Sequence, residues 1–323
     1  RACFGSRMSS VQITPPRPFS SSGILLSDTK DMYPVKINDH LWVLGNDYFH
    51  HYLIMGEESS ALVEMGISAT AGIVLAQLSS FGVEPDYLIV THPHSDHITG
   101  LDYLKNSYPY AAVIAGAGAE SFLSHPKAAQ SLIAEDKHML KALTARGLCP
   151  QASPVKNAPS LAGCKVVQDE EEVDLGDLKI HFLKVKGHSP GNILVHIPAL
   201  NTLLVSDSLG NHYPGRGFFP VFFTRFKDYL ETIDRLEKVS PTFLGLAHNG
   251  LFSDRKNIAS IFLNAKKAAS DVRRYISGDK RSDEEIAKDL FGFYYTDELA
   301  IYSSKNILNC CRLLVRRVRE IND

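Results

Sequence analysis

Three histidines and an aspartate lie within six residues, directly after an apolar run that is typical of a β-strand. The run is YLIV (Tyr87–Val90), and the cluster is His92, His94, Asp96 and His97. Residues two apart in an extended segment face the same side, so His92 and His94 can share one metal ion. A turn after them directs Asp96 and His97 to a second ion. Imidazole and carboxylate are ligands of zinc and related ions, so this placement favours metal binding over the alternative, a solvated histidine-rich loop.

Three further candidate ligands follow apolar strand-like runs and lie close to glycines. His188 lies in KGHSPGN, Asp207 in LLVSDSLG and His248 in LGLAHNG. A single histidine near a strand end is more often structural, but four such positions with matching ligand chemistry form a joint signal. The sequence therefore predicts a site for two divalent metal ions. Zinc is the expected ion, with iron or manganese as alternatives.

The order of strand and helix patterns predicts two similar halves, each a sheet with helices on its outer face. The first half contains the runs PVKI, LWVL, HYLIM and SALVEM before YLIV, and the second contains KVV, LKIHFLKV, NILVHI, TLLVS and TFLGLA. Helical spacing is expected over residues 70–81, 100–106, 119–146 and 226–238. We expect an N-terminal arm or leader over residues 1–30, a catalytic domain over 31–253 and a helical cap over 254–323.

The composition argues against some classes of binding partner. The 323 residues carry a net charge of −2, which lacks the basic footprint of a dedicated nucleic-acid binder, so no nucleic acid is expected. The helix-like segment RLLVRRVRE is expected to be partly solvated. No apolar run approaches the ~20 residues that span a bilayer, so no membrane partner is expected. The five cysteines form no CxxC pair, and a reducing cytoplasm is the expected location.

The motif order HxHxDH, GHSPG, SD and a final His before Gly resembles the metallo-β-lactamase superfamily. The resemblance covers residues 34–251 and implies an α+β fold, an αββα sandwich with the metals at one edge between the two sheets. It also implies how the ligands divide. The first ion would be held by His92, His94 and His188, the second by Asp96, His97 and His248, and Asp207 would bridge both.

The resemblance implies a metal-dependent hydrolase. Coordination lowers the pKa of bound water from about 15.7 toward ~7, so that hydroxide exists at neutral pH and attacks a carbonyl or phosphorus. Asp96 would orient the hydroxide or carry a proton. The true β-lactamases of the superfamily usually lack the bridging aspartate, so Asp207 argues against antibiotic hydrolysis as the main role.

Several stretches resemble the branch of the superfamily represented by the quinolone signal response protein, a thioesterase with C-terminal helices over its site. They are ALVEMGIS, SDSLG, FPVFFTRFKDYLETIDRLEKV and the helical tail. Glu64 stands where most of the superfamily has Asp, and this branch shares the difference. We therefore predict hydrolysis of a thioester or ester of a small acyl or aryl substrate. A phosphodiesterase or RNA-processing enzyme, a lactonase, and a ligand-sensing regulatory module remain as alternatives.

The run NHYPGRGFFPVFF supplies the candidate substrate contacts. Tyr213 is expected to donate a hydrogen bond to the developing oxyanion, as in the related lactonases. His212 is polar enough to reach the substrate, and Arg216 suits a carboxylate or phosphate. The run also contains three aromatic rings, those of Phe218, Phe222 and Phe223. They either line an apolar pocket beside the metals or pack in the core. The later run LFGFYYTDELA either closes the pocket or forms a contact in a homodimer.

Overall fold

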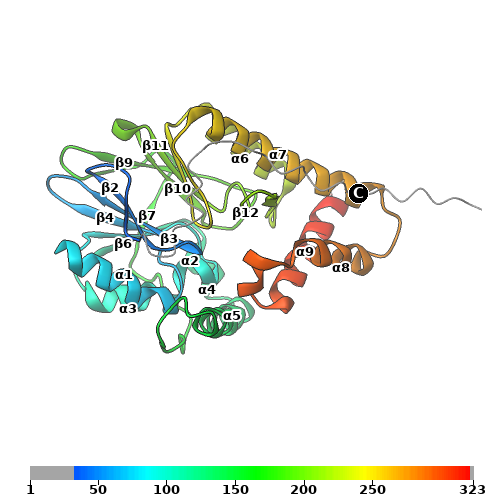
Figure 1. Cartoon of the computed structure of the whole chain (residues 1–323), viewed down its shortest axis with the longest axis horizontal. Helices are drawn as coiled ribbons and strands as arrows, with labels where there is room; N and C mark the ends of the chain where they lie inside the picture. Colours follow the sequence, from blue (N-terminus) through cyan, green and yellow to red (C-terminus); the bar gives the residue numbers. More distant parts are fainter. Residues whose placement is uncertain (1–32, 321–323) are drawn as a thin grey trace, which may run out of the picture.

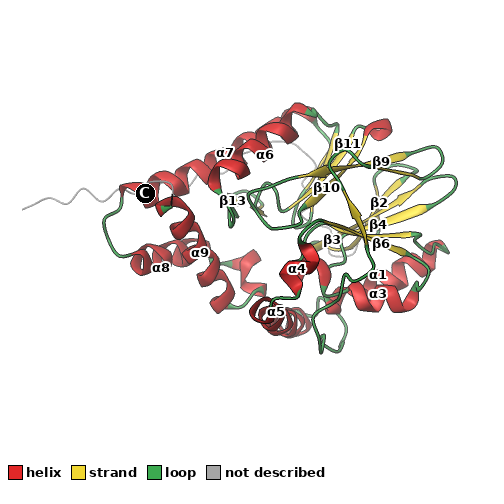
Figure 2. Ribbon diagram, turned by 180° about the vertical axis from the view of Figure 1, so that it is seen from behind, coloured by secondary structure: helices red, strands yellow, loops and turns green. Residues whose placement is uncertain are grey.

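Two β-sheets lie face to face, and helices cover the outer face of each (Figures 1 and 2). The computed structural model describes residues 33–320, so the predicted arm over residues 1–30 lies outside the described residues. An apolar cluster that includes Tyr52, Phe182 and Val195 fills the space between the sheets. The predicted αββα sandwich with added C-terminal helices is confirmed.

The first sheet has seven strands in the order of the sequence. Strands β4 to β7 pair in parallel and are covered on both faces, which explains why YLIV is a continuous apolar run. Leu53 and Leu62 face outward and pack against Val74 and Leu104 of the covering helices. The strands are β1 (Val35–Lys36), β2 (Leu41–Asn46), β3 (Phe49–Met55), β4 (Ser60–Val63), β5 (Tyr87–Val90), β6 (Ala112–Gly116) and β7 (Lys165–Val167).

The second sheet has six strands in the order β15-β14-β11-β10-β9-β8. Alternation along β9 and β10 places Phe182 and Val195 between the sheets and sends Leu183 and Leu194 outward, toward the helices. The strands are β8 (Glu172–Asp174), β9 (Lys179–Lys184), β10 (Ile193–Ile197), β11 (Thr202–Ser206), β14 (Phe243–Leu246) and β15 (Leu251–Phe252).

Strand direction brings the candidate ligands to one edge of the sandwich. Strands β11 and β14 pair in parallel, while β10 is antiparallel to both β9 and β11. Strands β9, β11 and β14 therefore run the same way, and their carboxyl ends lie at the same edge of the second sheet. His188, Asp207 and His248 each follow one of these ends closely.

The elements follow the predicted pattern with several differences. The run KVV, predicted with the second half, forms β7 and pairs with β6 in the first sheet, and the short helix α2 (Ser95–Ile98) stands where only a turn was expected. The predicted helix over 119–146 is split, because Pro126 begins a new helix after a turn at Ser124 and His125. A two-stranded hairpin, β12 (Asn211–Tyr213) and β13 (Gly217–Phe219), lies in the aromatic run, where no strand was predicted. The α-helices are α1 (Ser68–Phe81), α2 (Ser95–Ile98), α3 (Leu101–Ser107), α4 (Ala119–Leu123), α5 (Pro126–Ala145), α6 (Phe226–Lys238), α7 (Arg255–Gly278), α8 (Asp283–Tyr294) and α9 (Ser304–Arg319), with short 3-10 helices η1 (Pro198–Leu200) and η2 (Asp297–Ile301).

The C-terminal helices extend the molecule beyond the sandwich, with α9 between α7 and the α5 side of the first half (Figure 1). The basic side chains of α9 are matched by acidic ones: Arg312 contacts Glu284, and Arg319 contacts Asp283. This pairing agrees with the prediction that RLLVRRVRE forms a partly solvated helix. Within residues 33–320, no helix combines the length and the apolar character that crossing a membrane requires.

Candidate metal centre

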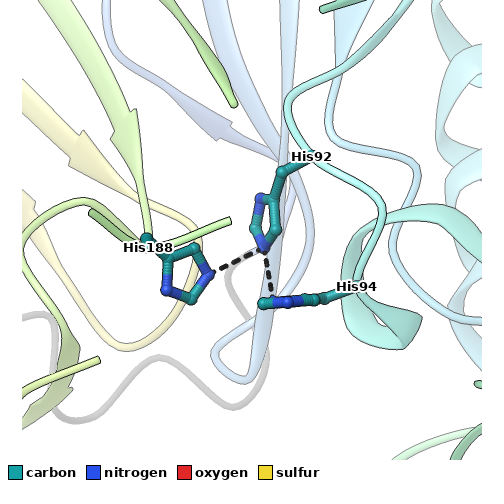
Figure 3. Close-up of side chains that lie close together, drawn as sticks. All are labelled: His92, His94 and His188. Carbon is teal, nitrogen blue, oxygen red and sulfur yellow. Dashed lines mark hydrogen bonds between the residues drawn. The ribbon is translucent and has the colours of Figure 1, made fainter. Parts of the chain in front are cut away.

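Three histidines converge at the edge of the sandwich and form the first group of candidate ligands (Figure 3). Nε2 of His92 lies 3.1 Å from Nδ1 of His94 and 3.1 Å from Nε2 of His188. His92 and His94 extend from the end of β5, and His188 comes from the loop after β9. The ligand atoms of the group lie within 4.8 Å of one another, which is a spacing that one cation can fill.

Hydrogen bonds at Nδ1 fix which ring nitrogen His188 and His248 offer to a metal ion. Nδ1 of His188 lies 2.9 Å from the carbonyl of Val221, and Nδ1 of His248 lies 2.6 Å from the carbonyl of Tyr48. A carbonyl only accepts, so Nδ1 carries the proton in both rings and Nε2 keeps a lone pair in the neutral form. Outer contacts of this kind are typical of metal-ligating histidines.

The second group contains Asp96, His97, Asp207 and His248. Helix α2 begins at Ser95, so the chain turns between His94 and Asp96 and separates the two groups. Nε2 of His97 lies 3.4 Å from Asp96 and 3.3 Å from Asp207. Nε2 of His248 lies 3.5 Å from each of the two carboxylates. Two carboxylates and two imidazoles form a ligand set that suits zinc, iron or manganese.

Asp207 lies within reach of both groups. Its Oδ2 is 3.3 Å from Nε2 of His97 and 3.7 Å from Nε2 of His188. These residues belong to different groups, so the carboxylate stands between them. The chemistry of the first group fits a cation, because lone pairs of His92 and His188 that face one another at 3.1 Å repel unless a proton or a cation lies between them.

The pKa shifts support the same interpretation. Burial and the neighbouring His188 ring lower the pKa of His94 to about 3, and burial with the His97 and His94 rings lowers the pKa of His92 well below its ordinary value. Both rings are therefore neutral at pH 7. Burial also acts to lower the pKa of His97, but Asp96, Glu64 and Asp207 outweigh it and raise that pKa well above its ordinary value. Negative charge thus dominates the second group, which favours a cation.

Glu64 orients His97 and is itself buried. Its Oε2 accepts a hydrogen bond from Nδ1 of His97 at 2.9 Å, and both carboxylate oxygens lie 3.0 Å from Oγ1 of Thr91. The backbone φ of Glu64 is 70°, and that of Ser206, directly before Asp207, is 47°. Left-handed conformations of non-glycine residues cost about 1–3 kcal/mol and cluster at functional sites. The strain therefore marks the same edge of the sandwich as the ligands do.

Two predicted substrate contacts lie elsewhere. The Tyr213 hydroxyl donates to the carbonyl of Tyr294 at 2.6 Å and is buried, so the structure does not place it as an oxyanion donor. Nδ1 of His212 donates to the carbonyl of Asn249 at 2.7 Å, so this ring supports the loop that carries His248. Both residues pair in the β12–β13 hairpin, which directs their polar atoms to neighbouring backbone.

The other predicted contacts divide between core, surface and site. Phe222 is fully buried against Phe226 and Tyr229, and Phe218 packs against the ring of His212. Arg216 is exposed and donates to Thr296 Oγ1 at 2.7 Å. Of the three candidate phenylalanines, Phe223 contacts the ligands: its ring centroid lies 5.4 Å from that of His188 and 6.4 Å from that of His94.

Several residues near the ligands were not predicted. The ring of Phe122, from α4, lies 5.9 Å from the ring of His94 on centroids. Tyr302 donates a hydrogen bond to Asp96 Oδ2 at 2.8 Å. No local motif marks these positions, because tertiary packing brings them to the site.

Comparison with known protein families and structures gives consistent results. Residues 50–248 match the family described as the metallo-beta-lactamase superfamily. The chain is 28% identical over 211 residues to the Metallo-beta-lactamase fold-containing protein ST1585 of Sulfurisphaera tokodaii, covering 63% of this chain and 74% of that protein. It is 24% identical over 136 residues to Glyoxylase B2 of Dictyostelium discoideum, which covers 42% of this chain and 39% of the relative.

Solved structures show the same fold. The crystal structure of ST1585 aligns with a TM-score of 0.54 at 21% identity and covers 87% of this chain and 98% of that one. A beta-lactamase domain protein from Burkholderia ambifaria aligns with a TM-score of 0.61 at 18% identity, covering 89% of this chain and 88% of that one. At these identities the likeness concerns the fold.

Proposed function

Since the chain belongs to the metallo-beta-lactamase superfamily, we propose that it is a two-metal hydrolase that cleaves the thioester or ester carbonyl of a small acyl or aryl substrate. The coarser part of this statement, a metal-dependent hydrolase, follows from the family and from the two ligand groups. The two-metal mechanism and the substrate class are the proposal.

The position of Asp207 is the observation that supports a two-metal mechanism. Its carboxylate lies between His188 of the first group and His97 of the second. Bound divalent ions would supply Lewis acidity and lower the pKa of a bound water to near neutrality. The chain's own part is to hold both ions and to orient its ligands: Val221 and Tyr48 fix two of the imidazoles through their carbonyls, and Glu64 fixes a third.

Aromatic side chains beside the first group support a substrate with an apolar acyl part. The rings of Phe122 and Phe223 both lie beside His94, at centroid distances of 5.9 Å and 6.4 Å. Apolar and aromatic walls with a few fixed polar groups are typical of small-molecule sites. Arg317 fixes the backbone at this point, because its Nε donates to the carbonyl of Phe223 at 2.7 Å.

The charge distribution favours a small molecule over a nucleic acid. Arg316 and Arg317 of α9 contact Glu320, and Arg312 and Arg319 contact acidic residues of α8. A helix whose cations are paired in this way offers little free charge to phosphates. The net charge of −2 points the same way.

The proposal predicts a clear order of substrates. We would load purified full-length protein with zinc and measure kcat/KM on a matched panel: acetyl and aryl thioesters, the corresponding oxygen esters, a lactone, bis-p-nitrophenyl phosphate and nitrocefin. The highest value is expected on the aryl thioester or ester, because Phe122 and Phe223 flank the first group. Removal of the metals with a chelator is expected to abolish that turnover, and added zinc to restore it.

Two results would contradict the proposal. Preference for the phosphodiester would replace the substrate class and leave the metal centre standing. Absence of metal-dependent turnover across the whole panel would favour the ligand-sensing alternative. A parallel panel with iron- and manganese-loaded protein separates a poor choice of ion from a true lack of activity.

A further inference from the structure

A hydrogen bond links the C-terminal segment to the candidate metal centre. The hydroxyl of Tyr302 donates to Oδ2 of Asp96 at 2.8 Å, although the two residues lie 206 positions apart. The same carboxylate oxygen lies 3.4 Å from Nε2 of His97 and 3.5 Å from Nε2 of His248. Tyr302 is 5% exposed, so its hydroxyl contacts a second-group carboxylate in a buried position.

The backbone around Tyr302 is held on both sides. Its carbonyl accepts a hydrogen bond from the Tyr295 hydroxyl at 3.0 Å. The next residue, Ser303, donates to Glu135 of α5 through its backbone N–H at 2.6 Å and through its hydroxyl at 2.7 Å. Ser303 also caps α9, because its hydroxyl accepts from the N–H of Asn306. The backbone that carries the phenol is therefore held by contacts that do not involve the ligands.

The geometry points to Tyr302 as a positioning residue that holds the Asp96 carboxylate for the second ion, so that the C-terminal helices complete the metal centre. This inference rests on the two-metal proposal above. Asp96 lies in α2, a helix of four residues. Without the hydrogen bond from Tyr302, its carboxylate would lose rotational freedom when an ion binds. Contacts outside the ligand shell that orient a ligand are typically worth 10–100-fold in metal affinity or activity.

The inference predicts a selective effect of Tyr302→Phe on metal binding. We would titrate the metal-free, full-length protein with zinc against a chromophoric chelator and fit two dissociation constants. Tyr302→Phe is expected to weaken one of them about 10–100-fold and to leave the other unchanged. The other constant belongs to the first group, which contains His92, His94 and His188, whereas the hydroxyl of Tyr302 donates to Asp96 of the second group.

Tyr213→Phe provides a matched control. It also removes the hydroxyl of a buried tyrosine, but that hydroxyl donates to the carbonyl of Tyr294 and not to a ligand. Both zinc constants should therefore match those of the wild-type protein. Thermal unfolding of both metal-free variants measures any general loss of stability, which a merely structural role of Tyr302 would produce.

The outcomes distinguish a failure of the two-metal proposal from a failure of the role inferred for Tyr302. If the wild-type protein binds fewer than two ions, the two-metal proposal fails, and this inference fails with it. If the wild-type protein binds two and Tyr302→Phe binds both equally well, the role of Tyr302 is refuted and the metal centre stands. Equal weakening of both ions, or a loss of turnover with unchanged affinities, would also refute positioning, in favour of a structural or a substrate-contacting role.

Discussion

Asp207→Asn is expected to lower kcat/KM by about a thousandfold or more, which corresponds to ~4 kcal/mol of transition-state stabilisation. The two carboxylate oxygens face different ligands: Oδ2 lies near His97 and His188, and Oδ1 lies near His248. Asparagine keeps the shape but removes the charge and one acceptor oxygen. The measurement is kcat/KM on the preferred substrate of the panel, together with the metal content per chain, which is expected to fall from two ions toward one.

Asp254→Asn is the matched control for this prediction. Asp254 caps α7 by accepting a hydrogen bond from the N–H of Asn257 at 2.9 Å, and asparagine caps a helix about as well as aspartate does. Turnover and metal content should therefore be unchanged. An Asp207→Asn variant that keeps more than about a tenth of the wild-type kcat/KM, a loss of less than ~1.4 kcal/mol, would contradict the bridging role.

Asp136→Ala is expected to lower the free energy of unfolding by about 3–5 kcal/mol. This fully buried carboxylate of α5 accepts four hydrogen bonds, from the N–H and hydroxyl of Ser68, the hydroxyl of Thr99 and the N–H of Val155. Its removal leaves the two N–H groups and the Ser68 hydroxyl buried and without this acceptor, whereas the Thr99 hydroxyl keeps the carbonyl of Ser95 at 2.8 Å. Urea unfolding of the metal-free protein measures the change.

Asp102→Ala is the comparison for this stability prediction. Asp102 is exposed in the first turn of α3, so its loss should cost less than about 1 kcal/mol through the helix dipole. A change of that small size for Asp136→Ala would show that water or repacking satisfies the remaining donors, and that the carboxylate does not connect α5 to the rest of the first half.

The positions of the candidate ligands are readable from the sequence because the information is local. His92 follows β5, and His188, Asp207 and His248 follow three strands that run in the same direction. An apolar strand followed by a polar ligand and a glycine-rich turn is visible in one short segment. The order of the segments then indicates the family, and with it the sandwich.

The supporting residues are not readable in the same way. Both Tyr213 and Tyr302 are buried tyrosines, yet one contacts a carbonyl and the other contacts Asp96. The difference depends on how residues 302–319 dock against α5, and that docking depends on tertiary contacts such as Glu135 with Ser303. The resemblance to the related lactonases favoured Tyr213, but its hydroxyl donates to the carbonyl of Tyr294.

The aromatic run shows why neighbouring residues of one type differ in role. Phe222 packs against Phe226 and Tyr229 in the core, while the next residue, Phe223, lies beside His188 and His94. No strand or helix was predicted for this run, so the sequence did not indicate which of the two rings faces the site. The glycines at 215 and 217, both with positive φ, were the available clue to the β12–β13 hairpin that precedes these two rings.

The most direct test of the central claim is turnover of metal-free protein as a function of added zinc. Two-metal catalysis predicts that turnover of the preferred thioester or ester rises until two equivalents per chain are bound, because Asp207 stands between two groups that each converge on one cation. Full activity at one equivalent, or turnover that does not respond to metal, would contradict it.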